Sequence, residues 1–274
     1  MRLAPDEIHL WLIPESLDKQ GMAAAHQNAA SMPRDAAVLH QYEALLCPEE
    51  RQRYHRFLFR RDRLRFLETR AAVRLLLSRY QPETEPAQWA FKRGEHGRPE
   101  LQTRTIMGPV SFNVSHSSGM IVLALTTAGR VGVDIERQAE GRRITELAQR
   151  YFAEDECAGM LALEGAEREQ RFYDLWTLKE AYVKAYGAGL KIPLRLFTFS
   201  YPAPDQIQVS FDRTLQEDPE RWLFWQLHCG TTHTAAVALH SAQGLRKEQI
   251  ALRIHEFELP GHTVTSDLPV TRRS

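Results

Sequence analysis

Cysteine is scarce in this 274-residue chain, and long apolar runs are missing from it. Cys47, Cys157 and Cys229 are odd in number, lie far apart and form no CxxC pair, which argues against a disulfide framework or a zinc knuckle. This usage fits a reducing compartment, so we expect a cytoplasmic protein. The longest uninterrupted apolar run covers residues 120–125 and falls far short of the roughly 20 residues that span a bilayer. No membrane association is therefore expected.

The chain also lacks the sequence marks of secretion and of disorder. Asp6 and Glu7 precede a short apolar run that ends at Pro14, where a signal peptide would have a basic region and a longer apolar one. Lys plus Arg and Asp plus Glu number 35 each, and 43% of the residues are hydrophobic, which excludes a disordered chain of high net charge. A folded chain of this length holds one large domain or two of about 120 to 140 residues. We expect two.

Helical and strand-like patterns alternate along both parts of the chain. Residues 15–37 are polar and Ala-rich without a clear apolar stripe, so we expect either a loop or a partly helical connection there. From Pro48 the apolar spacing predicts one long amphipathic helix that ends near Pro82. Other expected helices cover 144–152, 155–163 and 167–186, the last stopped by Gly187 and Gly189, and expected strands cover 8–14, 110–116, 120–127, 130–136, 196–201, 206–211, 222–228, 234–240 and 250–257. No repeat is visible between the two parts.

Positive charge is concentrated in one segment of this neutral protein. Residues 51–79 contain ten arginines but only Asp62 and Glu68 as acids, a local formal charge of +8. Such an asymmetry predicts an anionic ligand or partner.

Two carboxylates alternate along an expected strand. In Val131-Gly-Val-Asp-Ile-Glu136, strand geometry directs Asp134 and Glu136 to one face while Val133 and Ile135 enter the core. The two acids are then either both solvated, as on an ordinary polar face, or bound to a metal. Because no His or Cys lies nearby in the sequence, the metal would be Mg²⁺ or Mn²⁺.

A second charged group lies on the expected helix that ends at Gly187. At spacing i, i+4, Trp176, Glu180 and Lys184 form one ridge, so a carboxylate and an ammonium stand side by side. An isolated pair of this kind is usually a surface ion pair worth at most about 1 kcal/mol. The aromatic, charged and Gly-rich pattern around it favours a functional role.

Two further segments offer anion-binding groups. Phe112-Asn-Val-Ser-His-Ser117 runs from a strand into a turn where hydroxyls and an imidazole could hold a phosphate. Ser115 and His116 are adjacent on a strand and point to opposite faces, which disfavours a nucleophilic dyad. His116 could also be a structural hydrogen-bonding residue. Gly97-Arg98-Pro99 is a turn that presents one guanidinium.

Taken in order, these segments resemble the 4′-phosphopantetheinyl transferases of the surfactin-type branch. The resemblance covers roughly residues 40–200 and implies a pseudo-dimer of two similar α+β halves in one chain. The halves would be residues 1–127 and 128–260, with a tail at 261–274 that we expect to be mobile. The segments that carry it are Gly97-Arg-Pro99, Phe112-Asn-Val-Ser-His-Ser117, Gly132-Val-Asp-Ile-Glu136, Arg150-Tyr-Phe152 and Trp176-Thr-Leu-Lys-Glu-Ala181 with Lys184 and Gly187-Ala-Gly-Leu190.

The resemblance also implies an activity. Members of the family move the phosphopantetheine arm of coenzyme A onto a serine of an acyl, peptidyl or aryl carrier protein, release adenosine 3′,5′-bisphosphate and require Mg²⁺. Asp134, Glu136 and Glu180 look like the metal ligands, and Glu180 also looks like the base for the carrier serine. Lys184 and His116 can meet the charge that builds on the leaving phosphate. We expect a monomer, because such a chain builds its coenzyme A cleft alone.

Other family positions would contact coenzyme A. The family pattern puts Ser115 and Arg98 on its phosphates or adenine and Arg53 near its 3′-phosphate, and it places Glu156 where a further acid supports the site. Arg98 stands where many members have Lys, and the charge survives.

At position 50 the chain departs from the family. Glu50 occupies the place of a basic residue that grips the 3′-phosphate, so that contact would pass to neighbouring arginines such as Arg56 or Arg65.

The arginines allow an alternative function. A nucleic-acid-binding protein without enzymatic activity would use residues 51–79, but it would need a wider basic surface and stacking aromatics. It would also leave Asp134, Glu136 and Glu180 unexplained, so we expect no nucleic-acid partner.

Overall fold

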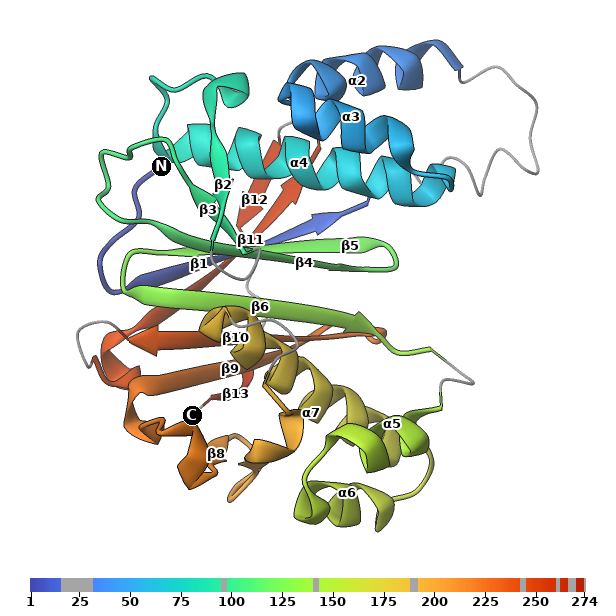
Figure 1. Cartoon of the computed structure of the whole chain (residues 1–274), viewed down its shortest axis with the longest axis vertical. Helices are drawn as coiled ribbons and strands as arrows, with labels where there is room; N and C mark the ends of the chain where they lie inside the picture. Colours follow the sequence, from blue (N-terminus) through green and yellow to red (C-terminus); the bar gives the residue numbers. More distant parts are fainter. Residues whose placement is uncertain are drawn as a thin grey trace.

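The computed structural model describes residues 1–15, 32–94, 98–139, 143–187, 192–241, 245–259, 262–265 and 270–273. Figure 1 shows two β-sheets lying against each other, with one group of helices above and another below. No helix among these residues is long and apolar enough to cross a membrane. Most of the connection expected at 15–37, together with Gly97 and Gly189, lies outside the described residues.

The first sheet has the strand order β12-β11-β1-β5-β4 and the second β13-β9-β10-β6. Two small hairpins, β2 with β3 and β7 with β8, accompany them. The strands are β1 (Glu7–Pro14), β2 (Phe91–Arg93), β3 (Pro99–Leu101), β4 (Ser111–Ser117), β5 (Met120–Thr126), β6 (Gly129–Arg137), β7 (Phe197–Ser200), β8 (Gln208–Phe211), β9 (Trp222–Cys229), β10 (His233–Ser241), β11 (Ala251–Glu258), β12 (His262–Thr265) and β13 (Val270–Arg273). The helices are α2 (Met32–Ala44), α3 (Pro48–Arg56), α4 (Arg60–Tyr80), α5 (Ile144–Tyr151), α6 (Glu154–Leu161) and α7 (Gly165–Tyr186).

The same order of elements occurs twice. β1, the helices ending in α4, hairpin β2–β3, β4 and β5 are followed by β6, the helices ending in α7, hairpin β7–β8, β9 and β10. In both sheets the last of these strands pairs between the other two, as β1-β5-β4 and β6-β10-β9. This topology confirms the expected two similar α+β halves.

Strand alternation divides the apolar side chains among three cores. Val131, Val133 and Ile135 of β6 pack with residues of the first sheet in a core between the two sheets. One further core lies under α4 and another under α7. The opposite face of β6, which carries Asp134 and Glu136, is thereby left toward α7, as the period of two predicted.

One helical expectation was wrong. The single helix expected from Pro48 is two helices, because the backbone is extended at Phe57 and Phe59. The ring of Phe57 turns back onto Phe66, with 5.3 Å between ring centroids. The connection expected at 15–37 is helical from Met32, where α2 begins, which agrees with the partly helical alternative.

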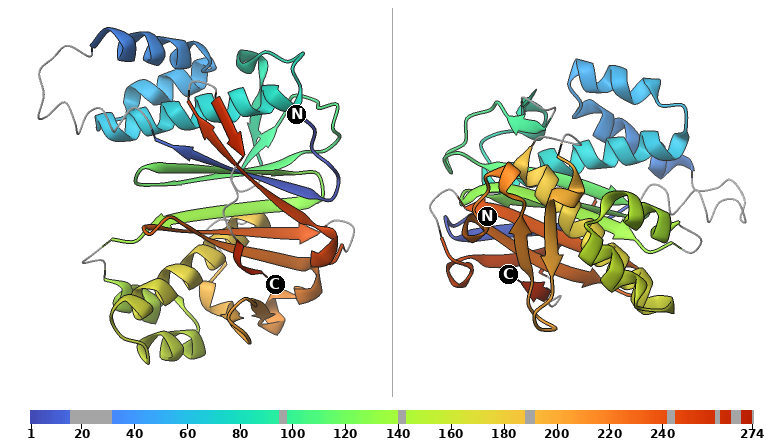
Figure 2. Two further views of the ribbon diagram at one scale, coloured as in Figure 1. Left: turned by 180° about the vertical axis from the view of Figure 1, so that it is seen from behind. Right: turned by 60° about the horizontal axis from the view of Figure 1, so that its bottom comes forward.

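The C-terminal segment also differs from expectation. β11, which was assigned to the second half, pairs in parallel with β1 of the first sheet, as Figure 2 shows from behind. Residues 262–265 and 270–273, expected to belong to a mobile tail, pair as β12 with β11 and as β13 with β9. These β-branched stretches cover edges that β11 and β9 would otherwise leave open.

The return of β11 creates a buried histidine pair. His9 of β1 and His255 of β11 lie with ring centroids 4.9 Å apart. His9 Nδ1 is 2.7 Å from the Tyr80 hydroxyl, which also accepts a hydrogen bond from Trp11. Among the described residues, Nε2 of His255 has no hydrogen-bond partner. Burial, followed by the nearby His9, lowers the pKa of His255 to about 4.

We expect His255→Phe to flatten the loss of thermal stability on acidification. The folded state keeps this ring neutral, whereas the unfolded chain binds a proton near pH 6.5, so stability is full above about pH 6.5 and falls towards about pH 4. Thermal unfolding followed by circular dichroism across this range measures the effect, with exposed His40→Phe as the control. An acid limb as steep in the His255 variant as in the wild type would contradict this assignment.

Candidate active site between the two halves

The two sheets meet along strands β4 and β6, each at the edge of its own sheet. β6 backbone amides donate to β4 side chains: Val131 to Ser111 Oγ and Val133 to Asn113 Oδ1, each at 3.0 Å, and Arg137 to Ser117 Oγ at 2.9 Å. Alternate small polar residues of β4 thus satisfy the exposed edge of β6. We call this line of contacts the seam.

Helix α7 packs directly on β6 because Gly132 has no side chain. A Cβ atom at Gly132 would lie 2.1 Å from the carbonyl oxygen of Ala181 and 2.4 Å from the amide nitrogen of Ala185. Both are backbone atoms that a side-chain rotation cannot move. The close approach brings Glu180 and Lys184 of α7 next to the polar face of β6.

Lys184, Ser115 and Asp134 form a hydrogen-bonded triangle across the seam. Lys184 Nζ lies 2.6 Å from Asp134 Oδ1 and donates to Ser115 Oγ at 2.7 Å. Ser115 Oγ in turn donates to the same Oδ1 at 2.9 Å. One residue each from β4, β6 and α7 therefore converge, and the second carboxylate oxygen of Asp134 is buried without a partner among the described residues.

Glu180 stands close enough to Asp134 and Glu136 to feel their charges. Burial raises the pKa of Glu180, Asp134 and Glu136 raise it further, and Lys184 opposes them. Within the described ranges, however, no three His, Cys, Asp or Glu residues are arranged as a ready metal cluster. The three acids thus share an electrostatic environment in which Asp134 is held by Lys184.

A cavity of about 530 Å³ crosses the seam at this triangle. It contains five of the residues singled out from the sequence, which come from α3, β4, β6 and α7: Arg53, Ser115, His116, Asp134 and Lys184. Its other lining residues are Phe57, Asp62, Arg65, Phe66, Thr69, Arg70, Pro99 and Val114. Of these, Phe57, Phe66, Thr69 and Arg70 were not named from the sequence. Thr69 follows Arg65 by one helical turn, and Arg70 follows Phe66 by the same step, and that spacing could have identified them.

His116 lies on this cavity with a lowered pKa. Partial desolvation is the main cause, and the positive charges of Arg65 and Lys184 add to it. A neutral imidazole is therefore favoured near neutral pH, with one ring nitrogen able to donate a hydrogen bond.

Three arginines of the arginine-rich segment are paired with glutamates of this protein. Glu50 is 2.7 Å from Arg74 and 3.4 Å from Arg70, and buried Glu15 is 2.5 Å from Arg65. The acid at position 50 is therefore a partner for α4. The free cationic surface that a nucleic acid would need is correspondingly reduced.

Arg53 remains available to a ligand. Its guanidinium lies over the rings of Phe57 and Phe66, at 6.0 and 5.3 Å from their centroids, and it is exposed. Among the described residues, no carboxylate pairs with it. Arg53 is thus a cation at the wall of the cavity.

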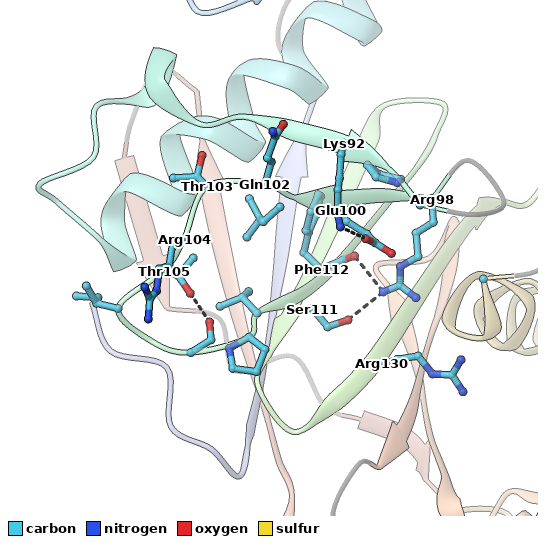
Figure 3. A pocket seen from close by; sticks show the side chains of 18 of the residues that line it. Lys92, Arg98, Glu100, Gln102, Thr103, Arg104, Thr105, Ser111, Phe112 and Arg130 are labelled. Atoms are coloured by element: carbon cyan, nitrogen blue, oxygen red, sulfur yellow. Dashed lines mark hydrogen bonds and ion pairs between the residues drawn. The ribbon is translucent and has the colours of Figure 1, made fainter.

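Arg98 does not line the cavity at the seam; it lines a second, larger cavity. The cavity of about 1180 Å³ shown in Figure 3 is lined by Arg98, Lys92, Arg104 and Arg130, and it shares Pro99 with the smaller one. Lys92 pairs with Glu100 at 3.3 Å. We assign the site to the smaller cavity, because it gathers the carboxylate, the ammonium and the imidazole.

Glu156, expected to support the site, is buried away from it. Its carboxylate lies 2.8 Å from Lys179 Nζ, which also donates to the carbonyls of Leu194 and Phe197 at 2.8 and 2.6 Å. Lys179 is fully buried and directly precedes Glu180. This ion pair fixes the rotation of α7 and so sets the direction of Glu180 from within the core.

We expect Gly132→Ala to lower stability by about 1–3 kcal/mol or more, since the new methyl group must push α7 off β6. Chemical denaturation measures the loss. Gly159→Ala is the matched control, because a Cβ atom there meets nothing within 4 Å. Wild-type stability of the Gly132 variant would show that α7 and β6 are less tightly apposed.

Comparison with known proteins agrees with this arrangement. Residues 130–239 match the model of the 4′-phosphopantetheinyl transferase superfamily, and residues 32–128 match that of the 4′-phosphopantetheinyl transferase N-terminal region. The two models meet between β5 and β6, where the second copy of the fold begins.

Individual relatives point the same way. A Synechocystis protein provisionally described as a 4′-phosphopantetheinyl transferase is 40% identical, and the match spans 58% of this chain and 63% of that protein. The 4′-phosphopantetheinyl transferase HetI of Nostoc is 30% identical over 69% of this chain and 73% of its own length. A phosphopantetheinyl transferase of Thraustochytrium is 31% identical over 81% and 80%. The chain belongs to the 4′-phosphopantetheinyl transferase family.

Proposed function

We propose that this chain transfers the 4′-phosphopantetheine arm of coenzyme A to a serine of an apo carrier protein and releases adenosine 3′,5′-bisphosphate. The observation that carries the proposal is the cavity at the seam, where Arg53, Ser115, His116, Asp134 and Lys184 meet. Cations suited to phosphates and a carboxylate group suited to a metal ion occur there together. The two halves build this cavity within one chain, which supports a monomer, and the free cysteines support a cytoplasmic location.

The residues fit a magnesium ion. The unpartnered oxygen of Asp134 is buried, and the pKa of Glu180 is raised first by burial and then by the neighbouring charge of Asp134, so a cation held by both carboxylates would be stabilising. Oxygen ligands of this kind are those that Mg²⁺ prefers. Asp134, Glu136 and Glu180 would hold the ion, which when bound neutralises charge on the diphosphate.

In this proposal Glu180 acts as the base. In the transfer, the carrier serine oxygen bonds to the β-phosphorus of coenzyme A, the bond from that phosphorus to the bridging oxygen breaks, and the serine proton goes to a carboxylate. A carboxylate whose pKa is raised by burial accepts a proton more readily near neutral pH. Lys184 Nζ and the neutral His116 line the cavity and supply hydrogen bonds to the leaving phosphate as its charge grows.

In this proposal, arginines of the first half bind the nucleotide end of coenzyme A. Arg53 has no carboxylate partner among the described residues, whereas Arg65 and Arg70 face the cavity with theirs. Arg53 therefore takes the 3′-phosphate in our proposal, and Ser115 lies near the diphosphate. Arg56, on the same helix, is exposed but does not line the cavity.

An exposed apolar turn beside the cavity suits a carrier protein. Leu58 and Phe59, between α3 and α4, are 93% and 71% exposed, and neighbouring Phe57 lines the cavity. Arg60 and Arg61 follow directly. Carrier proteins usually have acidic surfaces, so the turn offers apolar contact together with charge attraction where the serine must enter.

The direct test mixes the protein with apo carrier proteins, coenzyme A and Mg²⁺ and weighs the intact carriers. We expect the wild type to add the arm, Asp134→Ala to abolish transfer, and Glu180→Gln to slow it about 10²–10⁴-fold, as loss of a general base does. Exposed Glu146→Gln is the matched control. Wild-type turnover by either site variant would remove that residue from the mechanism, and no transfer to any carrier would refute the function.

We expect Leu58→Asp and Phe59→Asp to raise KM for the carrier about tenfold or more, the loss typical of a contact worth over 1 kcal/mol. The affinity for coenzyme A should stay unchanged, as measured by calorimetry. Ile106→Asp is the control, because Ile106 is 73% exposed and lines the other cavity. Equal KM values for all three variants would place the carrier elsewhere.

A further inference from the structure

Arg98 makes five hydrogen bonds within the protein. Its Nη1 donates to the carbonyls of Lys184 and Ala185, both at 3.0 Å. Its Nη2 donates to Ser111 Oγ at 2.9 Å and to the carbonyls of Phe112 at 3.2 Å and Val131 at 2.7 Å. One side chain thus joins the end of α7, the start of β4 and the start of β6, and Figure 3 shows it pointing at Ser111 and Phe112.

These bonds complete the C-terminus of α7. The last four carbonyls of a helix have no partner within the helix. Here Gly187 donates to Val183, Arg98 to Lys184 and Ala185, and Arg130 to Tyr186. The guanidinium is half-buried with no carboxylate in hydrogen-bond contact among the described residues, so the negative end of the helix dipole offsets its charge.

Lys184 is held both at its backbone carbonyl and at its side-chain ammonium. Arg98 binds the carbonyl of Lys184, and the ammonium of Lys184 binds Asp134 and Ser115. The guanidinium also contacts the seam. Ser111 Oγ accepts one hydrogen bond from Arg98 and another from the backbone amide of Val131. A shift of Arg98 would therefore displace α7 relative to β6 at the level of Lys184.

We propose that Arg98 is a positioning residue that locks α7 across the seam and so places Lys184, and that it does not bind a phosphate of coenzyme A. The inference rests on the transferase function proposed above. It replaces the role that the sequence suggested for this residue, because both terminal nitrogens are already directed at protein acceptors.

Lysine at this position separates the two roles. A phosphate contact needs a positive charge, which a lysine supplies. Bonding three elements at once needs the planar fork of a guanidinium, and the single ammonium of lysine cannot reach all five acceptors. The substitution Arg98→Lys is therefore informative, although many family members carry Lys in this turn.

The test compares Arg98→Lys with Arg104→Lys, an exposed arginine on the same cavity. At a temperature well below unfolding, we expect Arg98→Lys to lower kcat about tenfold or more while the Kd for coenzyme A changes less than about twofold, and Arg104→Lys to match the wild type. Wild-type kcat in Arg98→Lys, or a weaker Kd with kcat retained, would overturn the proposal. A purely structural role would lower the melting temperature but leave kcat of the folded enzyme unchanged, which also overturns it.

Two further measurements keep the outcome decisive. Amide hydrogen exchange of residues 183–187 should accelerate in Arg98→Lys even if the wild type proves inactive on every carrier, which separates this inference from the proposed function. If Arg98→Lys does not fold, Ser111→Ala removes one acceptor of Arg98 together with the seam acceptor of the Val131 amide, and it should lower kcat with Kd for coenzyme A unchanged. Unaltered exchange, or unaltered kcat in Ser111→Ala, would contradict the lock.

Discussion

The seam between β4 and β6 is the constraint on which the rest of the structure depends. Both strands are edges of their own sheets, and their backbones are joined by side chains: Ser111, Asn113 and Ser117 accept hydrogen bonds from β6 amides. Side-chain links leave more room between two strands than a ladder does. The cavity that holds Ser115 and Asp134 opens at this place, so the contact between the halves and the site have a common origin.

Two repeats of one topology meet at the seam with different tasks. The first contributes cations and an apolar turn through α3 and α4, and the second contributes carboxylates and Lys184 through β6 and α7. Gly132 and buried Lys179 fix α7 against β6 and against the core, and Arg98 fixes its end. The helix is therefore held at several points, which suits the positioning of an ammonium and a carboxylate that the proposed transfer requires.

Local periodicity was sufficient for part of this picture. The period of two placed Asp134 and Glu136 on one face, and the helical period placed Glu180 beside Lys184. Contacts between distant segments could not be read in this way. Lys179 is buried because Glu156 on another helix meets it, and Arg98 is occupied because carbonyls of three elements converge on it. The parallel pairing of β11 with β1 likewise depends on residues at opposite ends of the chain.

The most direct test of the account is amide hydrogen exchange with and without coenzyme A. The account places the ligand across the seam, so protection should appear together in α3 with its following turn, in β4 near Ser115 and in the last turn of α7. Residues 102–106 and 108–110, which line the larger cavity, should exchange at the same rate in both conditions. Protection of that loop, or protection confined to one half of the molecule, would contradict a site built by both.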